Sequence, residues 1–202
     1  RTVREAAALS LVMNGHPLTI EDILDAVSSR RATYSVRVSQ IFSILARNSV
    51  KDLTRIALDA GQDTAVRVMA IQALPNAGDF SILPAIEHLA DDSELDVRIA
   101  ALRCLGRMAH PVAAATVAKG LHNPAWQVRA VAAEAAGRIG LVDQVDRLAE
   151  MLGDDLWWVR QRSGEALVAL GPPGLNRLED LKAGGTGREN RTAALVLSER
   201  GG

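Results

Sequence analysis

The sequence predicts an all-α fold, an α-solenoid of about six helix pairs followed by a closing helix. Three observations predict it: a motif that recurs about every 31 residues, apolar residues at helical spacing after each motif, and a composition that is 48% hydrophobic but only 3% aromatic. Small aliphatic side chains suit closely packed helices. At 202 residues the chain can bury a sufficient core without disulfides or a bound metal.

The recurring motif is a Val-Arg dipeptide. It recurs at a step of 31 residues in the middle of the chain, and Asn190-Arg191 continues the series. Towards the N-terminus the steps become 30 and 33 residues. The series comprises Val3-Arg4, Val36-Arg37, Val66-Arg67, Val97-Arg98, Val128-Arg129 and Val159-Arg160. A repeat therefore runs through the whole sequence.

Each motif begins the first helix of a pair. Apolar residues follow at i, i+4, i+7 and i+8, and a second stripe begins about fifteen residues after the motif. Residues that break helices separate the two stripes: Asn14-Gly15-His16-Pro17, Asn76-Ala77-Gly78, His110-Pro111, Gly140 and Gly171-Pro172-Pro173. We expect Thr19, Ser49 and Asp79 to cap second helices.

These signals predict a single solenoid domain over residues 1–202. The expected repeats are residues 1–32, 33–62, 63–93, 94–124, 125–155 and 156–186, with a closing helix over 187–202. The last helix carries Asn190 in place of Val and Ser198 in place of Leu, which is typical of a polar cap. The first residues show no comparable cap, so we expect a fragment of a longer protein.

The repeated arginines have two interpretations, an internal ladder or an anion-binding stripe. Asp92 and Asp154 lie six residues before Arg98 and Arg160, so a guanidinium could bond turn carboxylates or carbonyls. Asn123 occupies the equivalent position before Arg129, which would need carbonyl partners. The ladder is favoured. Its members are Arg4, Arg37, Arg67, Arg98, Arg129, Arg160 and Arg191.

Three tryptophans stand close to the motif. Trp126 and Trp157 lie three residues before their arginines, and we expect them to plug the joint between repeats. Trp158 is additional, and a partner-binding role is equally open for it. Cys104 falls in a column of small buried residues and is not expected to act as a nucleophile. The four histidines lack metal-ligand spacing, so no metal or cofactor is expected.

Candidate partner-binding residues come from two surfaces. The outward positions of the second helices are expected to form the inner surface, with charges of mixed sign. Residues 79–96 hold six acidic residues and no Lys or Arg, which could receive a basic partner, although caps and loop solubility explain the acids equally well. The candidates are Glu87, His88, Asp91, Asp92, Glu94, Asp96, Lys119, Glu150 and Trp158.

The repeat sequences resemble short HEAT repeats of the phycobilisome-lyase type. Three stretches carry the resemblance: Asp92 to Gly106, Asn123 to Gly140, and Asp154 to Gly171. In that family a Trp before Val-Arg is frequent. The resemblance implies an α-solenoid fold, and it brings bilin or chromophore lyase activity as an alternative function.

The favoured function is a non-catalytic scaffold or adaptor that presents a helical-repeat surface to a protein partner. The net charge of −1 argues against nucleic-acid binding. No apolar run is long enough for a membrane span, and no signal peptide is visible. We expect a cytoplasmic bacterial protein, or the cytosolic part of a longer or membrane-anchored one.

Overall fold

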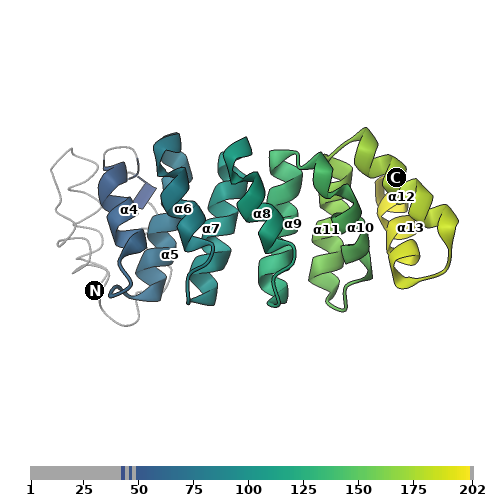
Figure 1. The fold of residues 1–202 in the computed structure, drawn as a ribbon, viewed down its shortest axis with the longest axis horizontal. Helices are drawn as coiled ribbons and strands as arrows, with labels where there is room; N and C mark the ends of the chain where they lie inside the picture. The colour runs from purple at the N-terminus through teal and green to yellow at the C-terminus, as the bar shows by residue number, and fades with distance from the viewer. Residues whose placement is uncertain (1–41, 44–45, 47–48, 201–202) are drawn as a thin grey trace. The chain divides into compact units, whose positions relative to one another are not determined.

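The computed structural model describes residues 42–43, 46 and 49–200, and every regular element in these residues is helical. In chain order the helices are α4 (Val50–Leu58), α5 (Thr64–Ala73), α6 (Leu83–Leu89), α7 (Leu95–Met108), α8 (Ala114–Gly120), α9 (Trp126–Ile139), α10 (Val145–Glu150), α11 (Trp157–Ala169), α12 (Pro172–Gly184) and α13 (Arg188–Arg200). Short 3-10 helices precede α6, α8 and α10: Phe80–Ile82, Pro111–Ala113 and Val142–Gln144. The predicted all-α solenoid fold is confirmed (Figure 1). No helix in residues 49–200 is long and apolar enough to cross a membrane.

The chain divides into two compact units, Arg1–Ala85 and Ile86–Gly202. In the described part of the first unit, α4 and α5 pack against each other. Their shared core contains Leu53, Ile56, Val66 and Ala70, each at most 6% exposed. The first expected repeat, with Thr19, lies outside the described residues. Ser49 stands at the N-cap of α4, but its side chain makes no capping bond, whereas Asp79 accepts from the Ser81 amide (2.9 Å).

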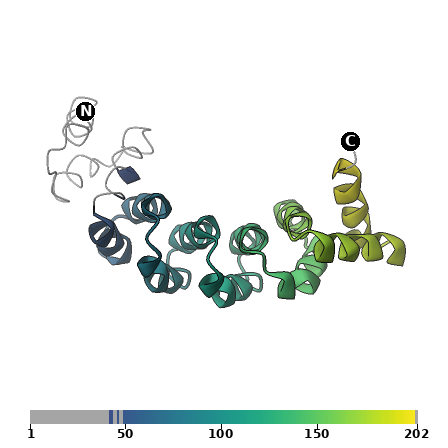
Figure 2. The same ribbon diagram turned by 90° about the horizontal axis from the view of Figure 1, so that it is seen from above.

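The second unit has two layers of helices. Within it, Figure 2 shows α7, α9 and α11 in one row and α8 and α10 in the other. The contacts of α9 with α7 and α11 are the most extensive, because glycine and alanine meet there. A Cβ added at Gly106 would lie 2.9 Å from the Cα of Ala135, and one at Gly137 would lie 2.9 Å from the Cα of Ala166.

This close approach sets the curvature of residues 86–200. The first helices lie closer together than the second helices, so the row of α7, α9 and α11 is on the concave side (Figure 2). The expectation that second helices form the inner surface is therefore wrong for this unit. The sequence shows the small residues at the first-helix contacts, but composition alone does not say which layer is more tightly spaced.

The turn after each first helix repeats one backbone feature. Positive φ occurs at Gly78 (67°), Ala109 (49°), Gly140 (84°) and Gly171 (70°), and these positions are 31 residues apart. Glycine accepts positive φ without steric cost, whereas the Cβ of alanine does not. Ala109, in the left-handed region, is thus the strained member of a glycine column.

Ala109→Gly should stabilise the protein by about 1 kcal/mol, because a left-handed L-residue costs about 1–2 kcal/mol and glycine loses part of this gain to backbone entropy. Urea unfolding would measure the change. The control is Ala194→Gly in the middle of α13, where glycine should destabilise by about 0.5–1 kcal/mol. A destabilising effect of both substitutions would contradict the strain at Ala109.

Candidate functional site

The repeated arginines hold the turn that precedes their own helix. In three repeats the Nη1 atom donates to two consecutive backbone carbonyls of that turn. The acceptors are Asp92 (2.7 Å) and Ser93 (2.8 Å) for Arg98, Asn123 (3.0 Å) and Pro124 (2.9 Å) for Arg129, and Asp154 (2.8 Å) and Asp155 (2.9 Å) for Arg160. A planar guanidinium with fixed donors suits two adjacent carbonyls.

The side chain of the first turn residue completes this arrangement. It accepts a hydrogen bond from the amide two residues later, at 2.9 Å in each repeat, which is an Asx turn. The pairs are Asp92 with Glu94, Asn123 with Ala125, and Asp154 with Leu156. Asp and Asn are interchangeable as the first turn residue. The arginine binds the backbone carbonyl of this residue, and the side-chain oxygen of Asp or Asn accepts from the amide two residues later.

Two other described members of the arginine column vary this pattern, and Arg129 adds a bond to it. Arg67 is 3% exposed and its Nε donates to the carbonyl of Ala57 (3.0 Å), and Arg191 donates to the carbonyl of Thr186. Arg129 also pairs with the carboxylate of Asp154 in the next turn, at 2.8 Å from Nη2. Arg4 and Arg37 lie outside the described residues. We propose a structural role for the whole column.

Several candidate acids in residues 79–96 already have partners inside the protein. Glu87 accepts from Thr116 Oγ1 (3.1 Å), and Asp91 pairs with Lys119 (2.8 Å), so both bond to the next second helix. Hydrogen bonds from the side chain and backbone of Ser81 lower the pKa of the Asp79 carboxyl. The sequence-predicted acidic surface is therefore partly a set of caps and bonds between repeats.

The remaining candidate partner-binding residues of the acidic segment and the second helices do not form one cluster. Asp92 belongs to an Asx turn, while His88, Glu94 and Asp96 are exposed. Glu150 pairs with Arg147 (3.0 Å).

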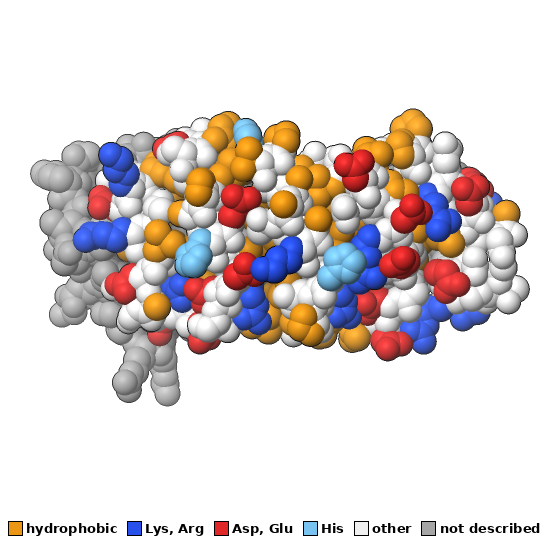
Figure 3. Space-filling model, viewed as in Figure 1, with side chains coloured by type: hydrophobic (Ala, Val, Ile, Leu, Met, Phe, Trp, Pro, Cys, Tyr) orange, Lys and Arg blue, Asp and Glu red, His pale blue; other side chains and the backbone are white. Residues whose placement is uncertain are grey.

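Charged side chains of both signs alternate on the second helices. Arg177 pairs with Asp146 (2.9 Å) in the same way as Lys119 with Asp91, across neighbouring repeats. Figure 3 shows acidic and basic side chains interspersed on the face that it displays. This arrangement provides bonds between repeats and a solvated surface of mixed charge.

The tryptophans differ in exposure. Trp126 is half-buried, but Trp157 and Trp158 are 50% and 53% exposed. Their rings meet edge to face, with centroids 4.6 Å apart. The plug expected at Trp157 is wrong, because half of this side chain is exposed to solvent and its ring packs against Trp158. An aromatic pair instead stands on the surface at the start of α11.

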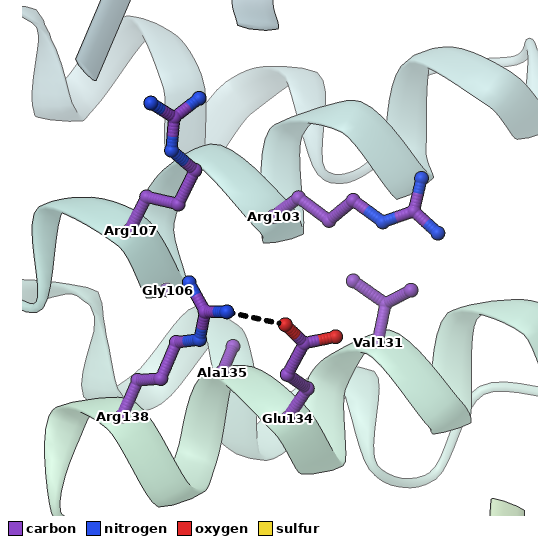
Figure 4. A pocket seen from close by; sticks show the side chains of 7 residues that line it. All are labelled: Arg103, Gly106, Arg107, Val131, Glu134, Ala135 and Arg138. Carbon is purple, nitrogen blue, oxygen red and sulfur yellow. Dashed lines mark ion pairs between the residues drawn. The ribbon is translucent and has the colours of Figure 1, made fainter. Parts of the chain in front are cut away.

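A shallow groove lies between α7 and α9 (Figure 4). It is on the exposed side of the row of first helices, α7, α9 and α11, which we call the first-helix face. It was not predicted from the sequence. Its accessible space is about 90 Å³. Arg103, Gly106 and Arg107 of α7 line one side, and Val131, Glu134, Ala135 and Arg138 of α9 line the other. Gly106 and Ala135 supply the small residues that leave this surface hollow.

The charges of the groove differ between its two sides. Glu134 pairs with Arg138 (2.8 Å) and lies 3.9 Å from Arg162 of α11. Arg103 and Arg107, by contrast, stand four residues apart on α7 and are both exposed. Like charges at this spacing destabilise a helix by about 0.2–0.5 kcal/mol. This i,i+4 arginine pair is the sequence signal that could have revealed the groove.

The described residues contain neither a metal-binding cluster of side chains nor an activated thiol. No group of three or more His, Cys, Asp and Glu side chains within residues 42–43, 46 and 49–200 could hold a metal ion. Burial raises the pKa of the Cys104 thiol to about 12, against an opposing influence of Arg107. The thiolate that a covalent attachment needs is thus suppressed near neutral pH.

Comparison with known proteins settles the family. Residues 50–135 and 115–198 match HEAT repeats. The chain belongs to the HEAT-repeat family. This confirms the family predicted from the Val-Arg repeats. The sequence matches no curated protein.

The fold of this HEAT-repeat chain is similar to that of solved structures, including the following two. The complex of CpcE and CpcF of phycocyanin lyase from Nostoc sp. PCC7120 gives a TM-score of 0.60 at 22% identity, over 91% of this chain and 77% of that chain. A computationally designed armadillo repeat protein for modular peptide recognition gives 0.54 at 14% identity, over 95% and 98%. At these identities the likeness concerns the fold.

The Cys104 thiol should not react with a disulfide reagent such as DTNB in the folded protein at pH 8, because its pKa of about 12 and its burial leave almost no accessible thiolate. Release of the coloured thiolate after mixing would measure this. One equivalent should react once the protein is unfolded in guanidinium. Rapid reaction of the folded protein would contradict the assignment.

Proposed function

We propose that this HEAT-repeat protein is a non-catalytic scaffold that binds a protein partner through its first-helix face. The observation that carries the proposal is the exposed pair of Trp157 and Trp158. Tryptophan is enriched among the residues that dominate protein interfaces, because it buries a large apolar area with little loss of side-chain freedom. Two such side chains, half-exposed and in contact, form a ready anchor for a partner.

Trp158 shares its helix face with charged residues. Trp158, Arg162 and Glu165 lie at i, i+4 and i+7 of α11, so they form one stripe. Arg162 pairs with Glu165 at 2.8 Å beside the aromatic pair. An apolar anchor next to polar groups of both signs is the usual composition of a protein-binding surface.

The fold supports the same proposal. Stacked helix pairs offer an extended, regular surface that suits a polypeptide partner. One structure similar in fold was designed for modular peptide recognition, and another is a complex of two proteins, CpcE and CpcF.

We also propose that both units belong to one solenoid, because the 31-residue step from Arg67 to Arg98 crosses the boundary after Ala85. We keep a cytoplasmic location as part of the proposal.

Chromophore lyase activity is the second candidate, and its support is the likeness to phycocyanin lyase in fold. Two observations weigh against it. The groove between α7 and α9 provides about 90 Å³, whereas small-molecule sites usually provide about 300 Å³ or more. The Cys104 thiol is buried and its pKa is raised to about 12.

Affinity capture with covalent cross-linking tests the scaffold. The tagged protein should retain a defined set of proteins from lysate, cross-linked near α11, and Trp157→Ala/Trp158→Ala should lose them because the anchor is removed. Val112→Ala is the control, since Val112 is 56% exposed and lies in the 3-10 turn before α8, away from α11 in the sequence. Equal melting temperatures would show that the variants fold.

Gly174→Val supplies a background control. A Cβ at Gly174 would clash with the carbonyl oxygen of Leu167, so this variant should disrupt the stack and capture only proteins that bind unfolded chains. A partner set that is the same for the folded protein and for Gly174→Val, or that ignores the tryptophan substitutions, would refute the proposed function.

A further inference from the structure

We infer that the groove between α7 and α9 receives an acidic segment of a polypeptide partner, with a carboxylate held by Arg103. This inference rests on the proposed scaffold function and names the chemistry of the partner. Arg103, Arg107, Val131 and Arg138 line the groove together with the small residues Gly106 and Ala135. The occupant is a peptide carrying Asp or Glu side chains.

The charge of the face favours an acidic occupant. Its outward positions on α7, α9 and α11 hold four arginines, at 103, 107, 138 and 162, against three acids, Asp96, Glu134 and Glu165. Both glutamates already pair with arginines of the same face, at 2.8 Å from Arg138 and Arg162 respectively. Arg103, on the α7 side of the groove, therefore keeps a positive charge that neither glutamate neutralises.

Arg103 is the arginine of this face whose guanidinium is most available to a ligand. It makes no hydrogen bond or ion pair with any residue that the structure describes, and its side chain is exposed. In Figure 4 its guanidinium stands at the groove beside Val131, away from the dashed Arg138–Glu134 pair. A guanidinium with its donors open offers a bidentate site for a carboxylate.

The neighbouring repeats show that the arginine pair is not required by the stack. One repeat earlier the two positions hold Gln72 and Asn76, and one repeat later they hold Glu134 and Arg138, which attract each other. Only α7 among the described first helices places two like charges at this spacing. The two guanidiniums point away from each other in Figure 4, so an anion bound at Arg103 would offset the repulsion through Arg103 alone.

The dimensions favour a peptide side chain over a nucleic acid. About 90 Å³ with an apolar floor of Val131 and Ala135 accommodates a short carboxylate side chain and an apolar neighbour. A nucleic-acid backbone needs a continuous track of basic groups. Here the glutamates of α9 and α11 interrupt the basic charge.

A selection of phage-displayed random dodecapeptides on the whole protein tests the inference. The selected peptides should be enriched in Asp and Glu, and their binding should weaken at high salt. Arg103→Glu should weaken synthetic versions of these peptides by about tenfold or more. The same change gives α7 the Glu-to-Arg spacing that α9 has, so the melting temperature should stay equal or rise.

Two further variants complete the design. The double substitution Arg103→Gln/Arg107→Asn reproduces the residues of the preceding repeat and should also abolish acidic enrichment. Arg177→Gln, an arginine of the other layer, should leave it unchanged.

Failure of the inference is distinct from failure of the scaffold. Selected peptides without acidic enrichment, no selected peptides, or acidic peptides that bind Arg103→Glu equally well would each overturn the groove assignment. Binding of single-stranded DNA that depends on Arg103 while peptides do not bind would overturn it in favour of a nucleic acid. Tryptophan-dependent capture of partners would preserve the scaffold in all of these cases.

Discussion

The hydrogen bonds from the repeated arginines to the preceding turn are the interaction on which the rest of the structure depends. Arg98 and Arg160 each bind two consecutive carbonyls of that turn, and the Asx side chain fixes its remaining amide. These bonds satisfy polar backbone groups where the chain passes from one repeat to the next. Each first helix therefore starts at a defined point relative to the helix before it, and the small residues of neighbouring helices come into register.

The repetition of this arrangement explains how much the sequence could predict. The Val-Arg step fixed the helix pairs and the family, because the residues that build the stack recur at constant spacing. Carbonyl partners were expected for Arg129, and it has them, but its additional pair with Asp154 of the next turn was not foreseen. The left-handed turn at Ala109 also had a signal, its place in a column of glycines.

Features that do not repeat were harder to predict. Arg103 at the groove stands in a column that holds Gln72, Glu134 and Glu165 in the other described repeats, so comparison of repeats averages it away. Trp157 is half-exposed although Trp126 occupies the same position of the preceding repeat, so the shared column did not reveal its exposure. The concave side of residues 86–200 depends on the relative spacing of two layers. Each of these features is set by distances between helices in the folded chain. Comparing equivalent positions of the repeats does not give those distances.

Peptide-resolved hydrogen exchange of Arg98→Met tests most directly whether the arginines organise the turns. The account predicts that amides at the start of α7 exchange about tenfold faster or more than in the unsubstituted protein, because the turn loses its carbonyl bonds. The equivalent segment at the start of α11, held by Arg160, should exchange unchanged. Equal exchange at the start of α7 in both proteins would contradict the account.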